Sequence, residues 1–256
     1  MKRGAEIARG KTKILYESVD RPECAIVVQM DAITAGDGAR RNEIIGKGRL
    51  ASLTTSRVFR LLNSRDLPTH YVSGGEDAEA NEMVVRRCEM IPLEVVVRGT
   101  VAGSYAKRHP LLRRGAPLDP RVLEFFLKDD ANHDPQIQPE EMLARGIVSP
   151  HELATMSGLA RRTFDILEEA WRRRNVLLVD LKVEFGRLAS GDRKGEIVVA
   201  DVIDNDSWRI WPHGHEEEML DKQMYRNLSH VDDEALARVR RAYEEVAEAV
   251  AGFVHG

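Results

Sequence analysis

Short apolar runs dominate the first third of the chain, whereas apolar residues spaced three and four apart dominate several later segments. The first pattern is typical of strands and the second of helices. We expect helices at 43–63, 149–174 and 232–254. We expect strands at 5–9, 13–17, 25–30, 83–90, 93–101 and 122–127. Pro92 would separate the strands at 83–90 and 93–101. The mixture predicts an α+β fold with a β-rich part, 1–90, and a larger mixed part, 91–256.

The start of the second helix carries the clearest local signal. Ser149 is an N-cap residue, Pro150 suits the first helical position, and Glu152 occupies the third. This combination is a capping box, in which serine and glutamate each bind a free backbone N–H group of the other residue. We therefore place the helix start at Ser149.

Two further strand-forming runs, at 176–186 and 196–209, are separated by the turn-forming segment Ser-Gly-Asp-Arg-Lys-Gly at 190–195. If they pair as a hairpin around that turn, Ala189 faces Glu196 and counting back places Glu184 opposite Asp201. Side chains alternate along a strand, so Asp180, Lys182 and Glu184 share one face.

Two carboxylates opposite each other repel unless a cation lies between them. Mg²⁺ is commonly held by one or two carboxylates together with phosphate oxygens. Glu184 and Asp201 are therefore candidate metal ligands. The alternative is a solvated surface hairpin whose charged side chains form salt bridges.

Composition narrows the range of functions. Of the 256 residues, 43% are hydrophobic and 31% are charged, which is typical of a soluble globular protein. The net charge of −4 argues against bulk nucleic-acid binding. Cys24 and Cys88 lack the spacing of a zinc site or disulfide framework, and the sequence shows neither a secretion signal nor a membrane-spanning run. We expect a cytoplasmic protein.

Two segments indicate anion binding. Gly10-Lys11-Thr12-Lys13 places two lysines in a flexible turn before a strand, which excludes a Walker P-loop but allows a flap over nucleotide phosphates. Arg98 ends an apolar strand and Ser104 begins a predicted helix, so guanidinium, hydroxyl and backbone N–H groups could converge on a phosphate. An ordinary β-turn and a solvent-exposed arginine are the simpler alternatives.

Taken together, these segments resemble the phosphoribosylaminoimidazole-succinocarboxamide synthase, or SAICAR synthetase, family over nearly the whole chain. The resemblance lies in the Gly10–Lys13 turn and in five further motifs: Thr-Ala-Gly-Asp-Gly-Ala-Arg at 34–40, Arg-x3-Ala-Gly-Ser at 98–104, Lys-Asp-Asp-Ala-Asn-His-Asp-Pro at 128–135, Asp-x-Lys-x-Glu-Phe-Gly at 180–186 and Asp-Lys-Gln-Met-Tyr-Arg at 221–226.

This resemblance implies an ATP-dependent ligase of purine biosynthesis. The family joins carboxyaminoimidazole ribonucleotide (CAIR) to L-aspartate, giving SAICAR, ADP and phosphate, with ATP and Mg²⁺ required. It also implies a two-lobed, kinase-like ATP-binding fold, and we expect the synthetase unit alone, without a carboxylase domain. We expect small-molecule substrates, no nucleic-acid or membrane partner, and a homo-oligomer.

The resemblance also implies roles for individual residues. Lys182 and Asp180 would be catalytic, beside the imidazole of the substrate, and Glu184 and Asp201 would bind the metal. ATP would contact Gly10, Lys11, Thr12, Lys13 and the hinge residues Arg87, Glu89 and Met90. The ribonucleotide phosphate would bind Arg98, Ser104 and Arg209, while Asp37, Arg40, Lys128 and Asp134 would help bind substrate or L-aspartate.

Two other functions remain open from the residues alone. A small-molecule kinase could use the same two-lobed ATP site, and a dependence of ADP release on L-aspartate would distinguish the two enzymes. A non-catalytic nucleotide-binding module would bind ATP without turnover. The presence of Lys11 and Asp201 argues against the module.

Overall fold

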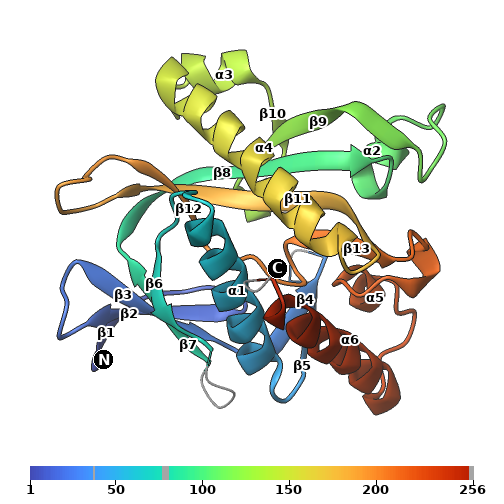
Figure 1. The fold of residues 1–256 in the computed structure, drawn as a ribbon, viewed down its shortest axis with the longest axis horizontal. Helices are drawn as coiled ribbons and strands as arrows, with labels where there is room; N and C mark the ends of the chain where they lie inside the picture. Colours follow the sequence, from blue (N-terminus) through green and yellow to red (C-terminus); the bar gives the residue numbers. More distant parts are fainter. Residues whose placement is uncertain (37, 77–80, 254–256) are drawn as a thin grey trace.

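The computed structural model describes residues 1–36, 38–76 and 81–253. It has the expected α+β composition, arranged as two lobes around two larger antiparallel sheets (Figure 1). The N-terminal sheet lies below the larger sheet in this view, and α1 and α6 lie side by side next to it.

The N-terminal sheet has the strand order β1-β2-β3-β7-β6. Its central strand β3 is buried along its whole length, because α1 packs on one side of it. The elements are β1 (Arg3–Arg9), β2 (Lys13–Ser18), β3 (Cys24–Gln29), β6 (Tyr71–Gly74), β7 (Glu82–Arg86) and α1 (Lys47–Ser64).

Helix α1 starts later than the expected residue 43. Residues Arg40–Glu43 form β5, which pairs with β4 (Ala32–Ala35). The carboxylate of Asp31 accepts hydrogen bonds from the backbone N–H groups of Gly46, at 3.0 Å, and Gly48, at 2.9 Å. These bonds satisfy N–H groups at the helix start, a feature that apolar periodicity alone does not reveal.

The larger sheet has the order β10-β9-β8-β11-β12, and β13 also pairs with β11. Helix α4 (Pro150–Arg172) covers it, and its capping box is confirmed by bonds between Ser149 and Glu152 in both directions, at 3.2 and 2.7 Å. The strands are β8 (Cys88–Thr100), β9 (Pro117–Leu127), β10 (Gln136–Ile137), β11 (Val176–Leu188), β12 (Ile197–Ala200) and β13 (Trp208–Pro212).

The expected break at Pro92 is wrong. The chain leaves the N-terminal sheet at Arg87, and β8 continues through Pro92. A register shift against β11, between the pairs Glu184↔Glu94 and Gly186↔Met90, gives β8 two extra residues there. Such a bulge accommodates a proline, which has no N–H group to donate. The division into lobes at residue 90 remains a prediction.

The hairpin of β11 and β12 forms as expected, but its predicted register is wrong by one residue. Glu184 pairs with Ala200, and Leu188, not Ala189, faces Glu196. The reason lies in a third segment: the N–H group of Ala189 donates to the carbonyl of Arg87 at 2.9 Å. Asp201 therefore follows the end of β12 instead of facing Glu184.

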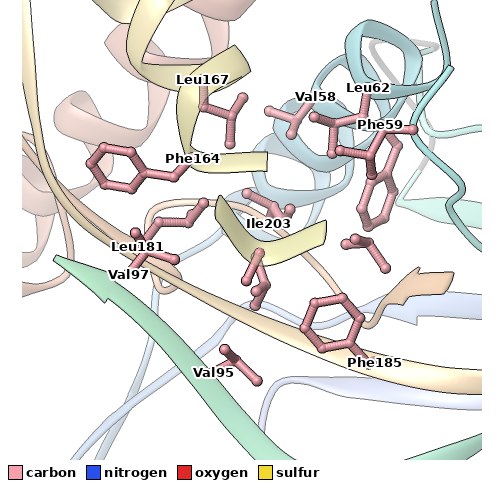
Figure 2. Close-up of a cluster of buried hydrophobic side chains, with 14 of the residues drawn as sticks. Val58, Phe59, Leu62, Val95, Val97, Phe164, Leu167, Leu181, Phe185 and Ile203 are labelled. Carbon is pink, nitrogen blue, oxygen red and sulfur yellow. The ribbon is translucent and has the colours of Figure 1, made fainter. Parts of the chain in front are cut away.

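One hydrophobic core connects the two lobes (Figure 2). Side chains of α1, α4, β8 and β11 meet around Ile203, and both sheets contribute to the same cluster. The labelled members are Val58, Phe59, Leu62, Val95, Val97, Phe164, Leu167, Leu181, Phe185 and Ile203. This shared core fixes the two lobes relative to each other on the side opposite the charged face of β11.

The remaining elements are short, apart from the last helix. Helix α6 (Asp233–Ala251) is capped by Asp232, whose carboxylate accepts from the N–H group of Ala235 at 2.8 Å. The others are α2 (Gly103–Arg108), α3 (Pro139–Ala144), α5 (Gln223–Arg226) and 3₁₀ turns at Asp130–Asn132 and Glu216–Glu218. Within the described ranges, no helix is long and apolar enough to cross a membrane.

Candidate active site

Four neighbouring cavities follow one another, and residues of β8 and β11 line three of them. A large cavity of about 890 Å³ lies between the Gly10–Lys13 turn and the charged end of β11. An apolar cavity of about 370 Å³ lies between the N-terminal sheet and residues of β8 and β11. An arginine cavity of about 190 Å³ contains Arg98 and Arg209, and an outer cavity of about 460 Å³ extends from it past Gly103. Adjacent cavities share lining residues, so together they form a continuous site.

Strand β11 presents Asp180, Lys182 and Glu184 to this site on one face, as the alternation of the strand predicts. The Nζ atom of Lys182 lies 2.8 Å from Oε1 of Glu94 and 3.1 Å from Oε1 of Glu184. Burial opposes the charge of Lys182, but the carboxylates of Glu184 and Glu94 outweigh it and raise the pKa of the lysine. Lys182 is therefore a permanent cation, suited to stabilising negative charge and unsuited to accepting a proton.

Glu184 is bound by a second lysine. The Nζ atom of Lys128 lies 2.5 Å from Oε2 of Glu184, which is only 3% exposed. Lys128 and Asp134 both line the large cavity, where the sequence places them. The backbone N–H group of Asp129 donates to Oδ1 of Asp134 at 2.8 Å, which orders this loop.

Asp201 occupies the first position after β12. Its φ of 62° is left-handed, which turns its side chain out of the strand alternation and into both the large and the apolar cavity. Burial would raise its pKa, but the positive charges of Lys13 and Lys182 lower it to about 2. The Nζ atom of Lys13 bonds directly to its carboxylate. Glu184 and Asp201 thus line the same two cavities, despite the incorrect register.

A buried network forms the arginine cavity. The guanidinium of Arg98 donates to Glu124, to Oδ2 of Asp180 at 3.2 Å and to Oγ of Ser104 at 3.3 Å. Arg209 donates to the same oxygen of Asp180. Asp180 therefore lies between two arginines and fixes both. Because both guanidinium groups bind its carboxylate, Asp180 orients the two arginines.

Gly103 is required beside Arg209. It has a φ of 53°, and an added Cβ atom would lie 2.6 Å from the guanidinium carbon. Only glycine combines this backbone conformation with so close an approach.

The Gly10–Lys13 turn joins β1 to β2 and lines the large cavity with all four residues. It is closed by a hydrogen bond from the N–H group of Gly10 to the carbonyl of Lys13, at 2.9 Å. Gly10 and Lys13 also line the apolar cavity, so the turn lies over the connection between the two cavities.

The other predicted residues are placed less uniformly. Arg87 and Met90 line the apolar cavity, whereas the carboxylate of Glu89 lies 3.4 Å from Nη1 of Arg187. The guanidinium of Arg40 donates to the carbonyls of Tyr225 and Leu228 and holds that segment of the chain. Asp37 lies outside the described residues.

Several site residues were missed by the sequence analysis. Glu94, Asp206, Lys222 and Arg226 line the large cavity, and His70 lines the apolar cavity. Arg226 and Lys222 stand in the Asp221–Arg226 motif, which was noted but given no role, and Asp206 closes the acidic segment that follows β12. A lone histidine such as His70 carries no comparable sequence signal.

A family model described as SAICAR synthetase matches residues 6–246. The chain is 52% identical over 255 residues to phosphoribosylaminoimidazole-succinocarboxamide synthase of Roseiflexus castenholzii, covering 100% of both chains. The crystal structure of the enzyme of that name from Ehrlichia chaffeensis has a TM-score of 0.85 and 29% identity, covering 96% of this chain and 98% of the other.

A second solved structure, a SAICAR synthetase (Type-2) in complex with ADP, has a TM-score of 0.83 and 32% identity, covering 96% of this chain and 97% of the other. The matches extend over essentially the whole chain, including both lobes and every segment that contributes to the four cavities. The chain therefore belongs to the SAICAR synthetase family.

Proposed function

We propose that this chain catalyses the ATP-dependent ligation of CAIR to L-aspartate, giving SAICAR, ADP and phosphate. Family membership supports this proposal and does not favour the small-molecule kinase. The single observation that carries it is the continuity of the site, since an apolar cavity, a lysine- and carboxylate-rich cavity and an arginine cavity follow one another. This order suits adenine, triphosphate and ribonucleotide phosphate.

ATP would bind with its adenine in the apolar cavity, between Val27 and Val85 of the N-terminal sheet and the hinge at Arg87 and Met90. The known ADP complex of a family member supports this use of a nucleotide. Lys11 and Lys13 would then cover the phosphates, and closure of the turn would exclude water from the reacting groups.

Glu184 and Asp201 fit a Mg²⁺ site by the chemistry of their donors. Both are carboxylates, and both line the two cavities through which the triphosphate would pass. Mg²⁺ typically takes one or two carboxylates and completes its shell with phosphate oxygens and water. Bound there, the ion would neutralise the charge that develops during phosphoryl transfer.

Arg98, Ser104 and Arg209 would bind the ribonucleotide phosphate, with Asp180 holding the two arginines in place. Lys182 would face the reacting carboxylate of CAIR between the two ends of the site. Since its pKa is raised, it would stabilise the negative charge as the carboxylate attacks the terminal phosphate.

A coupled assay of ADP release with CAIR, ATP and Mg²⁺, with and without L-aspartate, tests the proposal. The ligase releases ADP continuously only when L-aspartate is present, and SAICAR accumulates in equal amount. Continuous ADP release without L-aspartate would instead identify a kinase, and ATP binding without turnover would identify a non-catalytic module.

A further inference from the structure

One wall of the large cavity borders neither of its neighbours. It is formed by the tip of the Gly10–Lys13 turn and by the paired strands β4 and β5, together with the glycine after β4. In the proposed function, adenine fills the apolar cavity and the ribonucleotide phosphate fills the arginine cavity. The wall therefore faces the part of the triphosphate that lies farthest from adenine. The residues that line the large cavity here, and neither the apolar nor the arginine cavity, are Lys11, Thr12, Thr34, Ala35, Gly36 and Arg41.

Arg41 is the arginine of this wall, and its strand is fixed from behind. On the other face of β5, Arg40 donates to the carbonyls of Tyr225 and Leu228. On that same face, Asn42 accepts a hydrogen bond from the hydroxyl of Tyr225 at 2.7 Å. Since side chains alternate along a strand, Arg41 leaves the opposite face and lines the cavity. The backbone of β5 is thus held in place, while the side chain of Arg41 is exposed.

The guanidinium of Arg41 contacts the Gly10–Lys13 turn. Its Nη1 atom donates to the carbonyl of Lys11 at 3.3 Å. The turn also contacts the residue that precedes this hairpin segment, because the N–H group of Met30 donates to the carbonyl of Thr12 at 2.8 Å. A guanidinium carries five N–H donors, so the bond to Lys11 leaves donors of Arg41 for a ligand in the cavity. Arg41 can therefore hold the turn and a phosphate at the same time.

Arg41 differs from two lysines of the large cavity in the charge of its partner. Lys13 binds the carboxylate of Asp201. Lys128 binds the carboxylate of Glu184. The positive charge of each lysine is partly neutralised by its partner, whereas the carbonyl that Arg41 contacts is uncharged. Arginine binds phosphate oxygens in a fixed and often bidentate geometry. Arg41 can thus bind a phosphate without giving up its bond to the turn.

We propose that Arg41 binds the terminal phosphate of ATP and, through the carbonyl of Lys11, holds the Gly10–Lys13 turn closed over it. During transfer, the terminal phosphorus forms a bond to a carboxylate oxygen of CAIR while its bond to the bridging oxygen of ADP breaks. Arg41 stabilises the negative oxygens of the group that moves. The inference rests on the proposed function, which gives the places of adenine and CAIR. It adds a residue that directly follows the motif at 34–40.

Arg41→Ala tests the proposal with two nucleotides that differ in the terminal phosphate. We expect the Kd for a non-hydrolysable ATP analogue with Mg²⁺ to rise at least about tenfold, as loss of a charge-assisted hydrogen bond predicts. The Kd for ADP with Mg²⁺ should stay within about twofold of that of the unmodified enzyme. Titration calorimetry without CAIR or L-aspartate measures both values. Arg41→Lys keeps the charge and should recover part of the affinity for the analogue.

Arg161→Ala is the matched control. Arg161, on α4, is also exposed and donates to a backbone carbonyl, that of Arg121, at 3.2 Å. It lines none of the four cavities. The substitution should leave the Kd values for the analogue and for ADP unchanged, and a thermal melt of each variant shows whether it is folded.

Equal weakening of the analogue and ADP in Arg41→Ala, or no change in either, would overturn the proposal. A rise confined to the KM for L-aspartate would also overturn it, because that substrate would then contact Arg41 in place of the terminal phosphate. Failure of the proposed function is recognised separately. In that case the unmodified enzyme would form no SAICAR, whereas failure of the inference alone leaves SAICAR formation intact and the preference for the analogue over ADP insensitive to Arg41→Ala.

Discussion

The two ends of the charged face of β11 bind acids with different cations. At the arginine end, Asp180 is 5% exposed and Arg98 is 3% exposed, and each guanidinium makes fixed bonds to carboxylates. At the lysine end, Glu184 and Asp201 are bound by Lys13 and Lys128, whose side chains are 30% and 43% exposed. The charged side chains of the first end are thus more deeply buried than the lysines of the second end, which line the large cavity.

The difference indicates how each end meets its ligand. Guanidinium groups are planar donors in fixed geometry, so the arginine end can be assembled before a phosphate arrives. Lysines are point charges on flexible chains, so they can leave the carboxylates when a metal and a triphosphate enter. We infer a preformed phosphate site at one end and a site that rearranges on binding at the other.

The largest effect should follow from Asp201→Asn at the lysine end. Loss of this carboxylate leaves a bound Mg²⁺ under-ligated where charge develops, so we expect turnover to fall at least about a hundredfold, with ATP affinity largely kept. Steady-state kinetics at saturating Mg²⁺ and a thermal melt provide the measurement. Asp192→Asn, at an exposed position of the β11–β12 turn, is the control. Near-normal turnover in Asp201→Asn would remove Asp201 from the metal site.

At the arginine end, Arg209→Ala should weaken binding of the ribonucleotide by roughly ten- to a hundredfold, because one charge-assisted hydrogen bond is lost. The KM for ATP should not change. Arg209→Lys should recover little of the lost affinity for the ribonucleotide. A lysine ammonium group cannot bind the phosphate and Asp180 together in the fixed, planar geometry of a guanidinium group. An equal loss of affinity for ATP would show that the arginine end and the lysine end do not bind separate ligands.

Lys13→Ala should raise the KM for ATP by about three- to tenfold, as expected for one mobile cation on a phosphate. Amide exchange at residues 9–13 should slow when an ATP analogue binds the unmodified enzyme, because the turn closes over the nucleotide. Lys194→Ala, at an exposed position of the β11–β12 turn, is the control. If the amide exchange at residues 9–13 and the KM for ATP are both unaffected, Lys128 and not Lys13 would be the residue that rearranges on binding.

The smallest effect concerns His70, whose segment pairs with Val199 just before Asp201. Burial, opposed by a bond to the backbone of Asp201 and assisted by the charges of Lys13 and Arg86, lowers the pKa of His70 to about 3. The unfolded chain takes up this proton near pH 6.5 and the folded protein does not, so stability is lost as the pH falls.

Between pH 7.5 and 5.5 this loss should be about 1.4 kcal/mol in the free energy of unfolding, measured by urea titration. His70→Asn should lack that part of the pH dependence, whereas the exposed His230→Asn should keep it. The same slope in all three proteins would mean that burial does not hold His70 neutral in the folded protein.

Much of this site could be predicted from local sequence. Alternation placed Asp180, Lys182 and Glu184 on one face, and the capping box at Ser149 fixed the start of α4, because both depend only on near neighbours. Family motifs identified Arg98 and Arg209. The motifs do not indicate that Arg98 is buried between Asp180 and Glu124.

The parts that failed depend on contacts between distant segments. The register of the β11–β12 hairpin is decided by Arg87, about a hundred residues before its partner Ala189, and counting from a turn cannot include that bond. Similarly, the hydrogen bond that the hydroxyl of Tyr243 donates to Asp206 forms only when α6 is folded beside that carboxylate, because the two residues are remote in sequence.

Between Asp180 and Glu184 the pairing of β11 with β8 runs without interruption, from Asp180↔Arg98 to Glu184↔Glu94. Four residues of strand span about 13 Å, so the two ends of the site are held at a constant separation by a rigid sheet. Selection by combined length follows. In the proposed function, the ribonucleotide would extend from the arginines only as far as Lys182, and the triphosphate would cover the rest of the span from the other end. A free imidazole or a nucleoside without phosphate would lack the contacts of the arginine end.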